Sequence, residues 1–168
     1  STSSSSKPVL VPFLSGQSRL TADQQSTVTQ IAKALKEHPD AKLEITPLIN
    51  QNGDSEALHQ RTYNGLLKVA QSTMPEKERS REAAVRALFA MQFPKEDPKG
   101  LSVSEMESRL YKAVAPDRSN IGRLADARCR HIASAVSEAG IKENRIFITG
   151  PEFDKKSTVG GVKLRFVR

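Results

Sequence analysis

Residues 21–46, TADQQSTVTQIAKALKEHPDAKLEIT, contain the signals that decide the fold. The stretch opens with a Thr-x-x-Gln capping box, and apolar residues follow at helical spacing, which predicts a helix up to about Glu37. Pro39 ends this helix because the residue before a proline is driven out of helical geometry. Residues 42–46 then alternate apolar and polar side chains, as a strand does.

An apolar run, PVLVPFL, precedes this helix at residues 8–14 and predicts another strand. Pro12 favours an edge position or a bulge, because proline has no N–H to donate to a ladder. Strand, helix and strand with short connections form a βαβ unit, which implies a parallel pair with a right-handed crossover.

Helical patterns dominate the centre of the chain, and two strands are predicted near its C-terminal end. We expect a helix capped by Asp54, further helices up to the break at residues 116–117, and a last helix closed by Gly140. The C-terminal strands are expected at residues 145–149 and 162–166, the second after a Gly-Gly turn. The predicted fold is therefore α/β (α+β), with strands and helices in the order βαβ-α-ββ and a long helical stretch at about 54–118.

The composition fits one elaborated globular domain. The chain has 168 residues, 37% hydrophobic and 27% charged, with a net charge of +7. We expect residues 1–7, which include a serine tract, to be a linker or an expression scar, and residues 8–168 to form a single domain. No apolar run approaches the roughly 20 residues that a membrane helix needs, so no transmembrane segment is expected in this fragment.

Residues suited to catalysis or metal binding are few. The three histidines, His38, His59 and His131, have no metal-ligand spacing and are expected at the surface. Cys129 is the single cysteine and lies on the apolar stripe of its predicted helix, where a small buried hydrophobe is the expected role. No glycine-rich loop leads from a strand into a helix. We therefore expect no enzyme activity, no metal and no cofactor.

Arg128 is unusual because it lies on the apolar stripe of that helix, four residues after Leu124 and four before Ile132. A charge in such a place must be paired or must extend along its aliphatic stem to water. Two interpretations stay open: an ion pair or carbonyl contacts inside the fold, and a contact to a ligand.

Four short stretches, in this order, resemble the OmpA C-terminal-like domains, many of which bind peptidoglycan. They are FLSGQSRLT at 13–21, KLEITPLINQNG at 42–53, LADARC at 124–129 and GIKENRI at 140–146. The order strand, helix, strand, helices, strand, strand is also that of the family. The resemblance implies a βαβ-α-ββ sheet with helices packed on one face and a long helical insertion at about 54–118. It also implies that the stretches before and after the insertion meet at one rim of the sheet.

The resemblance also implies a binding site, with two departures from the family. The family's site pairs an aspartate with an arginine, which grip the ammonium and carboxylate of the cell-wall diamino acid. Arg128 matches the arginine, but Asn50 stands at the aspartate position, and Pro47 replaces the glycine of the motif that leads to it. The degenerate site predicted from the resemblance comprises Asn50, Asp54 and Arg128. The second departure is the long helical insertion.

With its insertion, the chain looks more like the C-terminal region of certain large AsmA-like bacterial envelope proteins of unknown function. That resemblance implies a periplasmic domain, tethered to the inner membrane by upstream sequence, in a superfamily associated with lipid transport and outer-membrane assembly. The leading hypothesis is a non-catalytic interaction or scaffold module that contacts an envelope protein or a lipid-transfer partner.

Two alternatives stay open. One is a peptidoglycan anchor that uses Arg128 and Asn50. The other is a basic nucleic-acid-binding domain, prompted by the net charge and by cations near the C-terminus such as Lys155, Lys156 and Lys163. Nucleic acid is not the expected partner, because aromatic residues make up only 5% of the chain.

Overall fold

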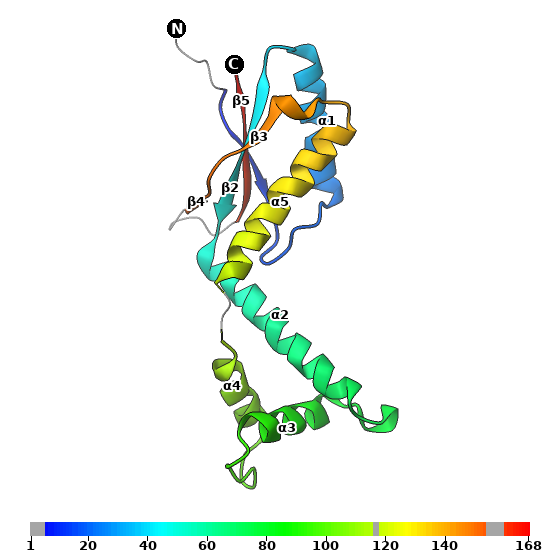
Figure 1. The fold of residues 1–168 in the computed structure, drawn as a ribbon, viewed down its shortest axis with the longest axis vertical. Coiled ribbons are helices and arrows are strands. Elements are labelled where there is room, and N and C mark those ends of the chain that lie inside the picture. The colour runs from blue at the N-terminus through cyan, green and yellow to red at the C-terminus, as the bar shows by residue number, and fades with distance from the viewer. Residues whose placement is uncertain (1–5, 116–117, 154–159) are drawn as a thin grey trace. The chain divides into compact units, whose positions relative to one another are not determined.

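The computed structural model describes residues 6–115, 118–153 and 160–168, and it has a mixed α/β fold (Figure 1). The chain divides into two compact units. The first comprises residues 1–56 and 118–168, and the second comprises residues 57–117. The boundary between them falls within one helix, α2 (Gln51–Ser72).

The first unit contains a mixed sheet and two long helices. The helices are α1 (Ala22–Glu37) and α5 (Ser119–Glu138), with a short 3₁₀ turn η2 (Glu143–Arg145). The strands are β1 (Val9–Pro12), β2 (Lys42–Ile49), β3 (Ile146–Ile148), β4 (Glu152–Phe153) and β5 (Gly161–Val167). The bounds of α1 confirm the helix predicted from its capping box, in which the Gln24 side chain accepts the Thr21 N–H at 2.6 Å.

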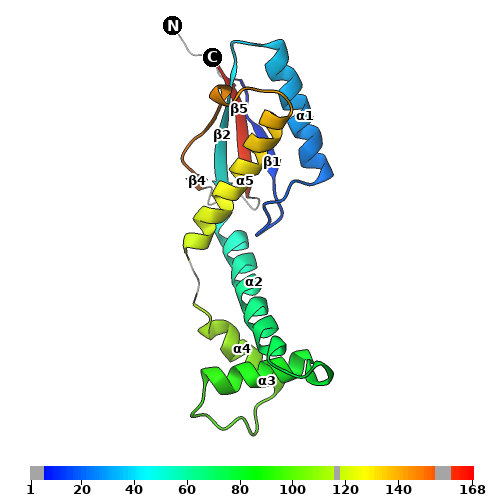
Figure 2. The ribbon, with the colours of Figure 1, turned by 45° about the vertical axis from the view of Figure 1, so that its right-hand side comes forward.

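The strand order is β1-β5-β2-β3, with β4 also paired to β2. Strand β5 is antiparallel to both β1 and β2 (Figure 2), so these two run in the same direction without touching. The prediction that they form a directly bonded parallel pair was wrong. The last strand of the chain occupies the place between them, and the parallel partner of β2 is β3. Pro12 ends the edge strand β1, as predicted.

Strand β2 is longer than predicted because it continues through Pro47 to Ile49. The N–H of Thr149 donates to the Ile45 carbonyl at 2.9 Å, so by the alternation of a ladder Pro47 would also bond on the β3 side. A proline has no N–H to give there. The pairing of β3 with β2 ends at Ile45, and β4 resumes it at Leu48, so the sheet tolerates the proline by leaving a gap.

Helices α1 and α5 pack on one face of this sheet and enclose the core of the unit (Figure 2). Every second residue of β5 points inward: Val162 is 0% exposed and Leu164 is 1% exposed. The inner residues of the helices and strands form one cluster. Its members include Val28, Ile31, Leu35, Leu43, Ile45, Cys129, Ile132, Val136, Val162 and Leu164.

The second unit is helical and has a core of its own. Besides the later turns of α2 it contains η1 (Glu76–Glu78), α3 (Arg81–Gln92) and α4 (Val103–Ala113). The α4 capping box is formed, since the Glu105 N–H donates to the Ser102 hydroxyl at 3.1 Å. The core residues are Tyr63, Leu67, Ala70, Ala84, Val85, Phe89, Met106 and Leu110. The predicted break at residues 116–117 lies outside the described residues.

Candidate functional site

Arg128 lies on the inner face of α5 and is one of the most buried side chains of the chain, with 1% of its surface exposed. Its helix neighbours Leu124, Ala125 and Ile132 are buried too. A guanidinium cannot be left uncompensated in such surroundings, because an unpaired buried charge costs several kcal/mol. The contacts of this group therefore decide what the site can do.

The compensating charge is Asp54, in the first turn of α2, which is also 1% exposed. Arg128 Nη1 donates to Asp54 Oδ2 at 2.9 Å, and Arg128 Nη2 donates to Asp54 Oδ1 at 2.8 Å. Two parallel charge-assisted bonds of this kind are the strongest arrangement available to an arginine and a carboxylate. Asp54 was predicted to cap α2, and that prediction was wrong, because the helix already begins at Gln51.

The loop between β1 and α1 supplies the remaining contacts of the pair. Arg128 Nε donates to the Gln17 carbonyl at 2.7 Å, and Nη2 donates to the Leu14 carbonyl at 3.1 Å. The Gly16 N–H donates to Asp54 Oδ1 at 2.9 Å. The guanidinium carbon also lies 5.4 Å from the centre of the Phe13 ring, within the range of a cation–π contact. This loop encloses the ion pair and bonds to both of its partners.

Gly160 closes the cluster from the side of β5. A Cβ at this position would lie 2.6 Å from Asp54 Oδ2, 3.0 Å from Arg128 Nη1 and 3.2 Å from the Asn50 backbone nitrogen. Only a residue without a side chain fits this approach. The sequence contains a signal for it, the Gly160-Gly161 pair, which we interpreted only as a turn.

Asn50 lies beside this cluster, where its side chain bonds to the start of α2. Its Oδ1 accepts the Gly53 N–H at 3.2 Å, so it caps the first turn of α2. The structure thus brings the three predicted site residues together at one rim of the sheet. Asp54, rather than a ligand, occupies the charged face of the arginine, and this is the first of the two interpretations left open by the sequence.

Cys129 follows Arg128 on α5 and is fully buried in the core of the first unit. Burial raises the pKa of its thiol to about 11, with a smaller contribution from Asp126. A thiol with so high a pKa carries almost no thiolate at neutral pH, so it is unsuited to nucleophilic attack. Its role is that of a small apolar core residue.

The histidines do not meet. His131 contacts the Ser18 carbonyl, and His59 contacts the Tyr111 carbonyl at 2.8 Å while stacking on its ring at 4.0 Å. Among the described residues, no group of three or more His, Cys, Asp and Glu side chains is arranged to hold a metal ion.

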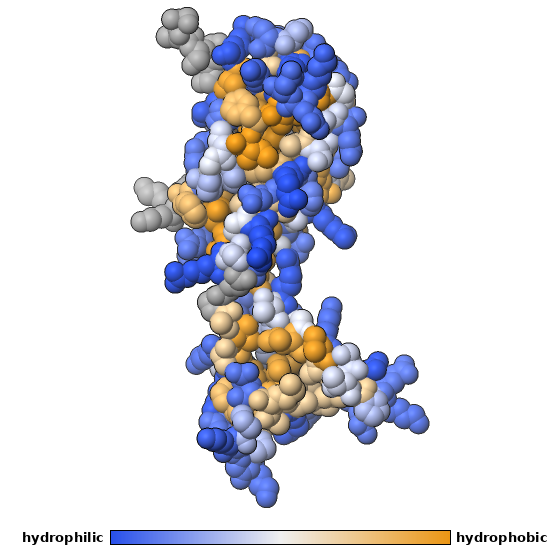
Figure 3. All heavy atoms as spheres, viewed as in Figure 1, coloured by the Kyte–Doolittle hydropathy of each residue, from blue (hydrophilic) through white to orange (hydrophobic). Residues whose placement is uncertain are grey.

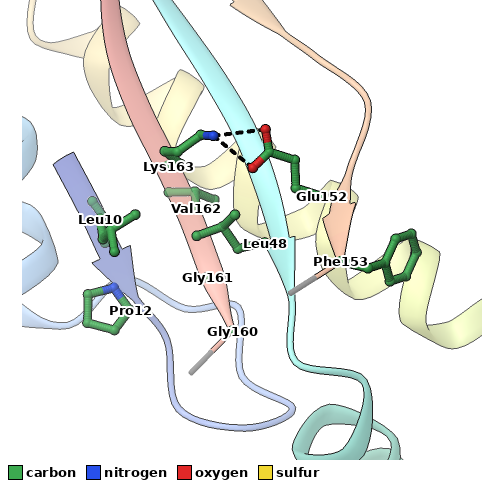
Figure 4. Close-up of a pocket in the computed structure, with 10 residues that line it drawn as sticks. Leu10, Pro12, Leu48, Glu152, Phe153, Gly160, Gly161, Val162 and Lys163 are labelled. Atoms are coloured by element: carbon green, nitrogen blue, oxygen red, sulfur yellow. Dashed lines mark hydrogen bonds and ion pairs between the residues drawn. The ribbon is translucent and has the colours of Figure 1, made fainter. Parts of the chain in front are cut away.

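An apolar groove of about 650 Å³ lies on the first unit's sheet (Figure 4). Leu10 and Pro12 of β1 lie on one side of β5, and Leu48 of β2 lies on the other. The Lys163 ammonium bridges both carboxylate oxygens of Glu152, at 2.7 and 2.8 Å, across the groove. Its single charge pair makes the groove more suited to apolar contacts than to an ionic ligand.

Two of the basic residues near the C-terminus have acidic partners in the part of the chain that the structure describes. Lys163 is bonded to Glu152, and Arg168 lies 3.7 Å from Asp40. Lys155 and Lys156 lie outside the described residues.

Tyr63 is a buried titratable group of the second unit. It is 2% exposed, and its hydroxyl donates to Glu107 Oε1 at 3.1 Å. Burial, together with the Glu107 charge, raises the pKa of the phenol to about 12. The contact connects α2 to α4 and acts as a structural hydrogen bond.

None of the helices in the described ranges is long and apolar enough to cross a membrane. No protein-family model matches the sequence, and a search of curated proteins returns no significant relative. The structure itself defines the class: the chain is a mixed α/β protein, with five α-helices and a five-stranded sheet in the described residues.

Proposed function

We propose that this chain is a non-catalytic interaction or scaffold module of a larger AsmA-like envelope protein. The observation that carries this proposal is the Arg128–Asp54 pair. Both side chains are 1% exposed, and hydrogen bonds to Asp54, Gln17 and Leu14 engage all three guanidinium nitrogens. The arginine that would grip a cell-wall ligand is thus used to hold the first unit together, and binding falls to other surfaces.

The element order supports the envelope part of the proposal. Strand, helix, strand, helices and then the C-terminal strands follow one another as in the domains that the sequence resembles. Domains of that kind belong to the periplasm, and the AsmA-like version is tethered to the inner membrane. A partner in that compartment is an envelope protein or a component of lipid transfer.

The non-catalytic part of the proposal is supported by what the titratable groups do. Cys129 is buried with a raised pKa, and His59 and His131 contact backbone carbonyls in different units. Nucleophilic catalysis needs such groups within reach of one another and of a substrate.

A peptidoglycan anchor is the second candidate, because an aspartate and an arginine do lie side by side at this rim. For that function Arg128 must leave Asp54 and the two loop carbonyls to meet the carboxylate of the cell-wall diamino acid. The new ion pair with the ligand must also offset the free energy lost when the Arg128–Asp54 pair breaks and the loop is displaced. The closed geometry favours the interaction module.

Sedimentation with purified bacterial sacculi separates the two candidates. The proposal predicts that the chain stays in the supernatant at about 0.15 M salt, apart from weak attraction between its +7 charge and cell-wall carboxylates. Such attraction disappears at high salt. Pelleting that persists at high salt and is released by the free diamino acid supports the anchor and contradicts the proposal.

The positive half of the test is a quantitative pull-down from bacterial envelope extract, with an unrelated protein of similar size and charge as the control. Recovery of a protein partner above this control supports an interaction module. The same recovery from both proteins contradicts it.

A further inference from the structure

The sheet of the first unit ends at β3, and no other strand of the described residues lies on its outer side. Because the Thr149 N–H bonds to β2, the alternation of the ladder directs the backbone of Phe147 inward as well. The backbone groups of Ile146 and Ile148 therefore face away from β2. The Ile146 N–H donates to the Glu143 carbonyl of η2, so the edge offers the Ile146 carbonyl and the N–H and carbonyl of Ile148. An edge of this kind is a template for another extended chain.

The side chains of β3 lack the features that normally protect an edge. Natural edge strands carry charges, prolines or bulges that discourage pairing. The opposite edge, β1, ends in Pro12, whereas β3 reads Ile-Phe-Ile. Phe147 is 39% exposed and Ile148 is 45% exposed. Exposed apolar side chains beside unpaired backbone groups are expected where a partner strand adds.

A groove of about 290 Å³ lies between β3 and α5. The helix contributes only small side chains, Ala133, Ser134 and Ser137, and these leave space beside Ile146 and Ile148. Figure 3, which has the same orientation as Figure 1, shows apolar residues gathered on the part of the surface where Figure 1 places β3 and α5. A strand added to β3 would direct every second side chain into this groove.

Glu143 lines the groove and gives it a charge. Its side chain is exposed, and it makes no ion pair with any residue that the structure describes. A basic residue in the added chain would find its complement there. Aliphatic and basic side chains are thus the chemistry that this surface fits.

We propose that the β3 edge binds an extended segment of a partner protein as an added strand, with an aliphatic side chain in the β3–α5 groove and a basic residue near Glu143. Main-chain hydrogen bonds to the Ile146 carbonyl and to the N–H and carbonyl of Ile148 hold the segment, and the groove selects its side chain. This inference rests on the proposed interaction role and names the kind of partner.

The test uses the full chain and a synthetic acetylated hexapeptide, a lysine followed by alternating valine and threonine. Amide chemical shifts and hydrogen exchange are followed by NMR during titration. The expected result is a saturable shift centred on β3 and slower exchange of the Ile148 amide. Shifts centred elsewhere, or no shift up to about 1 mM peptide, overturn the proposal.

Two substitutions test the geometry separately. Ile148→Pro removes an outward N–H but no bond to β2, and Ser134→Phe fills the groove without touching the strand backbone. Each is expected to weaken peptide binding at least about tenfold, which is roughly 1.4 kcal/mol. Asp126→Phe adds the same ring to an exposed position of α5 outside the groove and should change binding less than about twofold. Equal binding by all three variants contradicts the proposal.

The charge has its own control. Glu143→Gln should weaken binding of the lysine peptide but leave binding of a peptide with threonine in place of lysine unchanged. Equal effects on both peptides contradict the assigned charge complementarity.

Sedimentation of the chain alone tests whether a second copy of the chain occupies the edge. A dimer that Ile148→Pro dissolves assigns the edge to self-association and overturns the partner-segment proposal. A peptide that does not bind overturns the β3 proposal but says nothing about sedimentation with sacculi. The β3 proposal and the proposed function can therefore be refuted independently.

Discussion

Removal of the Asp54 carboxylate leaves Arg128 buried with its charge uncompensated. In Asp54→Ala the guanidinium loses bonds of 2.9 and 2.8 Å to the carboxylate, and the Gly16 N–H loses its acceptor. Breaking one side of a buried ion pair costs about 3–5 kcal/mol. With a urea dependence of about 1–3 kcal/mol per molar, the unfolding midpoint of the first unit should fall by roughly 1–5 M.

The assay must report on the first unit alone, because the chain has two compact units and need not unfold in one step. Cys129 provides the probe, since it is 0% exposed in that unit and its thiol becomes accessible only on unfolding. Pulsed thiol labelling across a urea series then gives the midpoint for the wild type and each variant.

The stability of the double variant Asp54→Leu with Arg128→Met shows whether the ion pair behaves as a buried or as a solvent-exposed one. Removing both charges together leaves no uncompensated ion, so the double variant should be no less stable than Asp54→Ala alone. With Asp54→Leu and Arg128→Met as the single variants of the cycle, each costing about 3–5 kcal/mol, the coupling free energy should be at least about 3 kcal/mol. A solvent-exposed pair would instead give single variants that each cost under about 1 kcal/mol, with effects that add without coupling. That result would contradict the burial of the Arg128–Asp54 pair.

Further predictions concern glycines and titrating groups. Gly160→Ala should destabilise the first unit by about 1–3 kcal/mol in urea unfolding, because its Cβ would press on the ion pair. Gly65→Ala, in α2 with nothing within 4 Å of its Cβ, should instead stabilise the second unit by about 0.5–1 kcal/mol, followed by the loss of helical circular dichroism in urea. Destabilisation of each unit by its own variant would contradict the packing argument. Cys129, whose pKa is raised to about 11, should resist a thiol reagent at pH 8 in the native chain and react fully in urea. Tyr63 should titrate near pH 12, seen by ultraviolet absorbance against Tyr63→Phe. Because its folded pKa lies above the unfolded value of 10, this group's contribution to stability is present below pH 10 and is lost as pH rises toward 12. Titration of both tyrosines near pH 10 would contradict the burial of Tyr63.

Local signals in the sequence predicted most elements, because each helix has its own start and stop residues. The capping boxes at Thr21 and Ser102 both formed, and Gly140 adopts the positive φ of 104° expected of a helix C-cap. Pro47 misled the prediction of β2, since whether a strand tolerates proline depends on what its neighbour bonds. Strand β4, only Glu152–Phe153, gave no periodic signal.

Long-range pairing was the part that the sequence could not supply. The alternation of residues 162–166 predicted a strand, but nothing local indicated that it would separate β1 from β2. The position of Arg128 on an apolar stripe predicted that it must be paired or extended to water. Which carboxylate pairs with it depends on where α2 begins, and Asn50 rather than Asp54 proved to be the capping residue.

The central claim is that Arg128 is closed to ligands by Asp54 and by the loop that carries Leu14 and Gln17. NMR titration of the native chain with a soluble muropeptide, observed at the Arg128 Nε–H and the Gly160 amide, tests this most directly. The account predicts that both signals stay in place at every muropeptide concentration. A saturable shift of the Arg128 signal that carries Gly160 with it would show that the pair opens to the cell-wall ligand and would contradict the account.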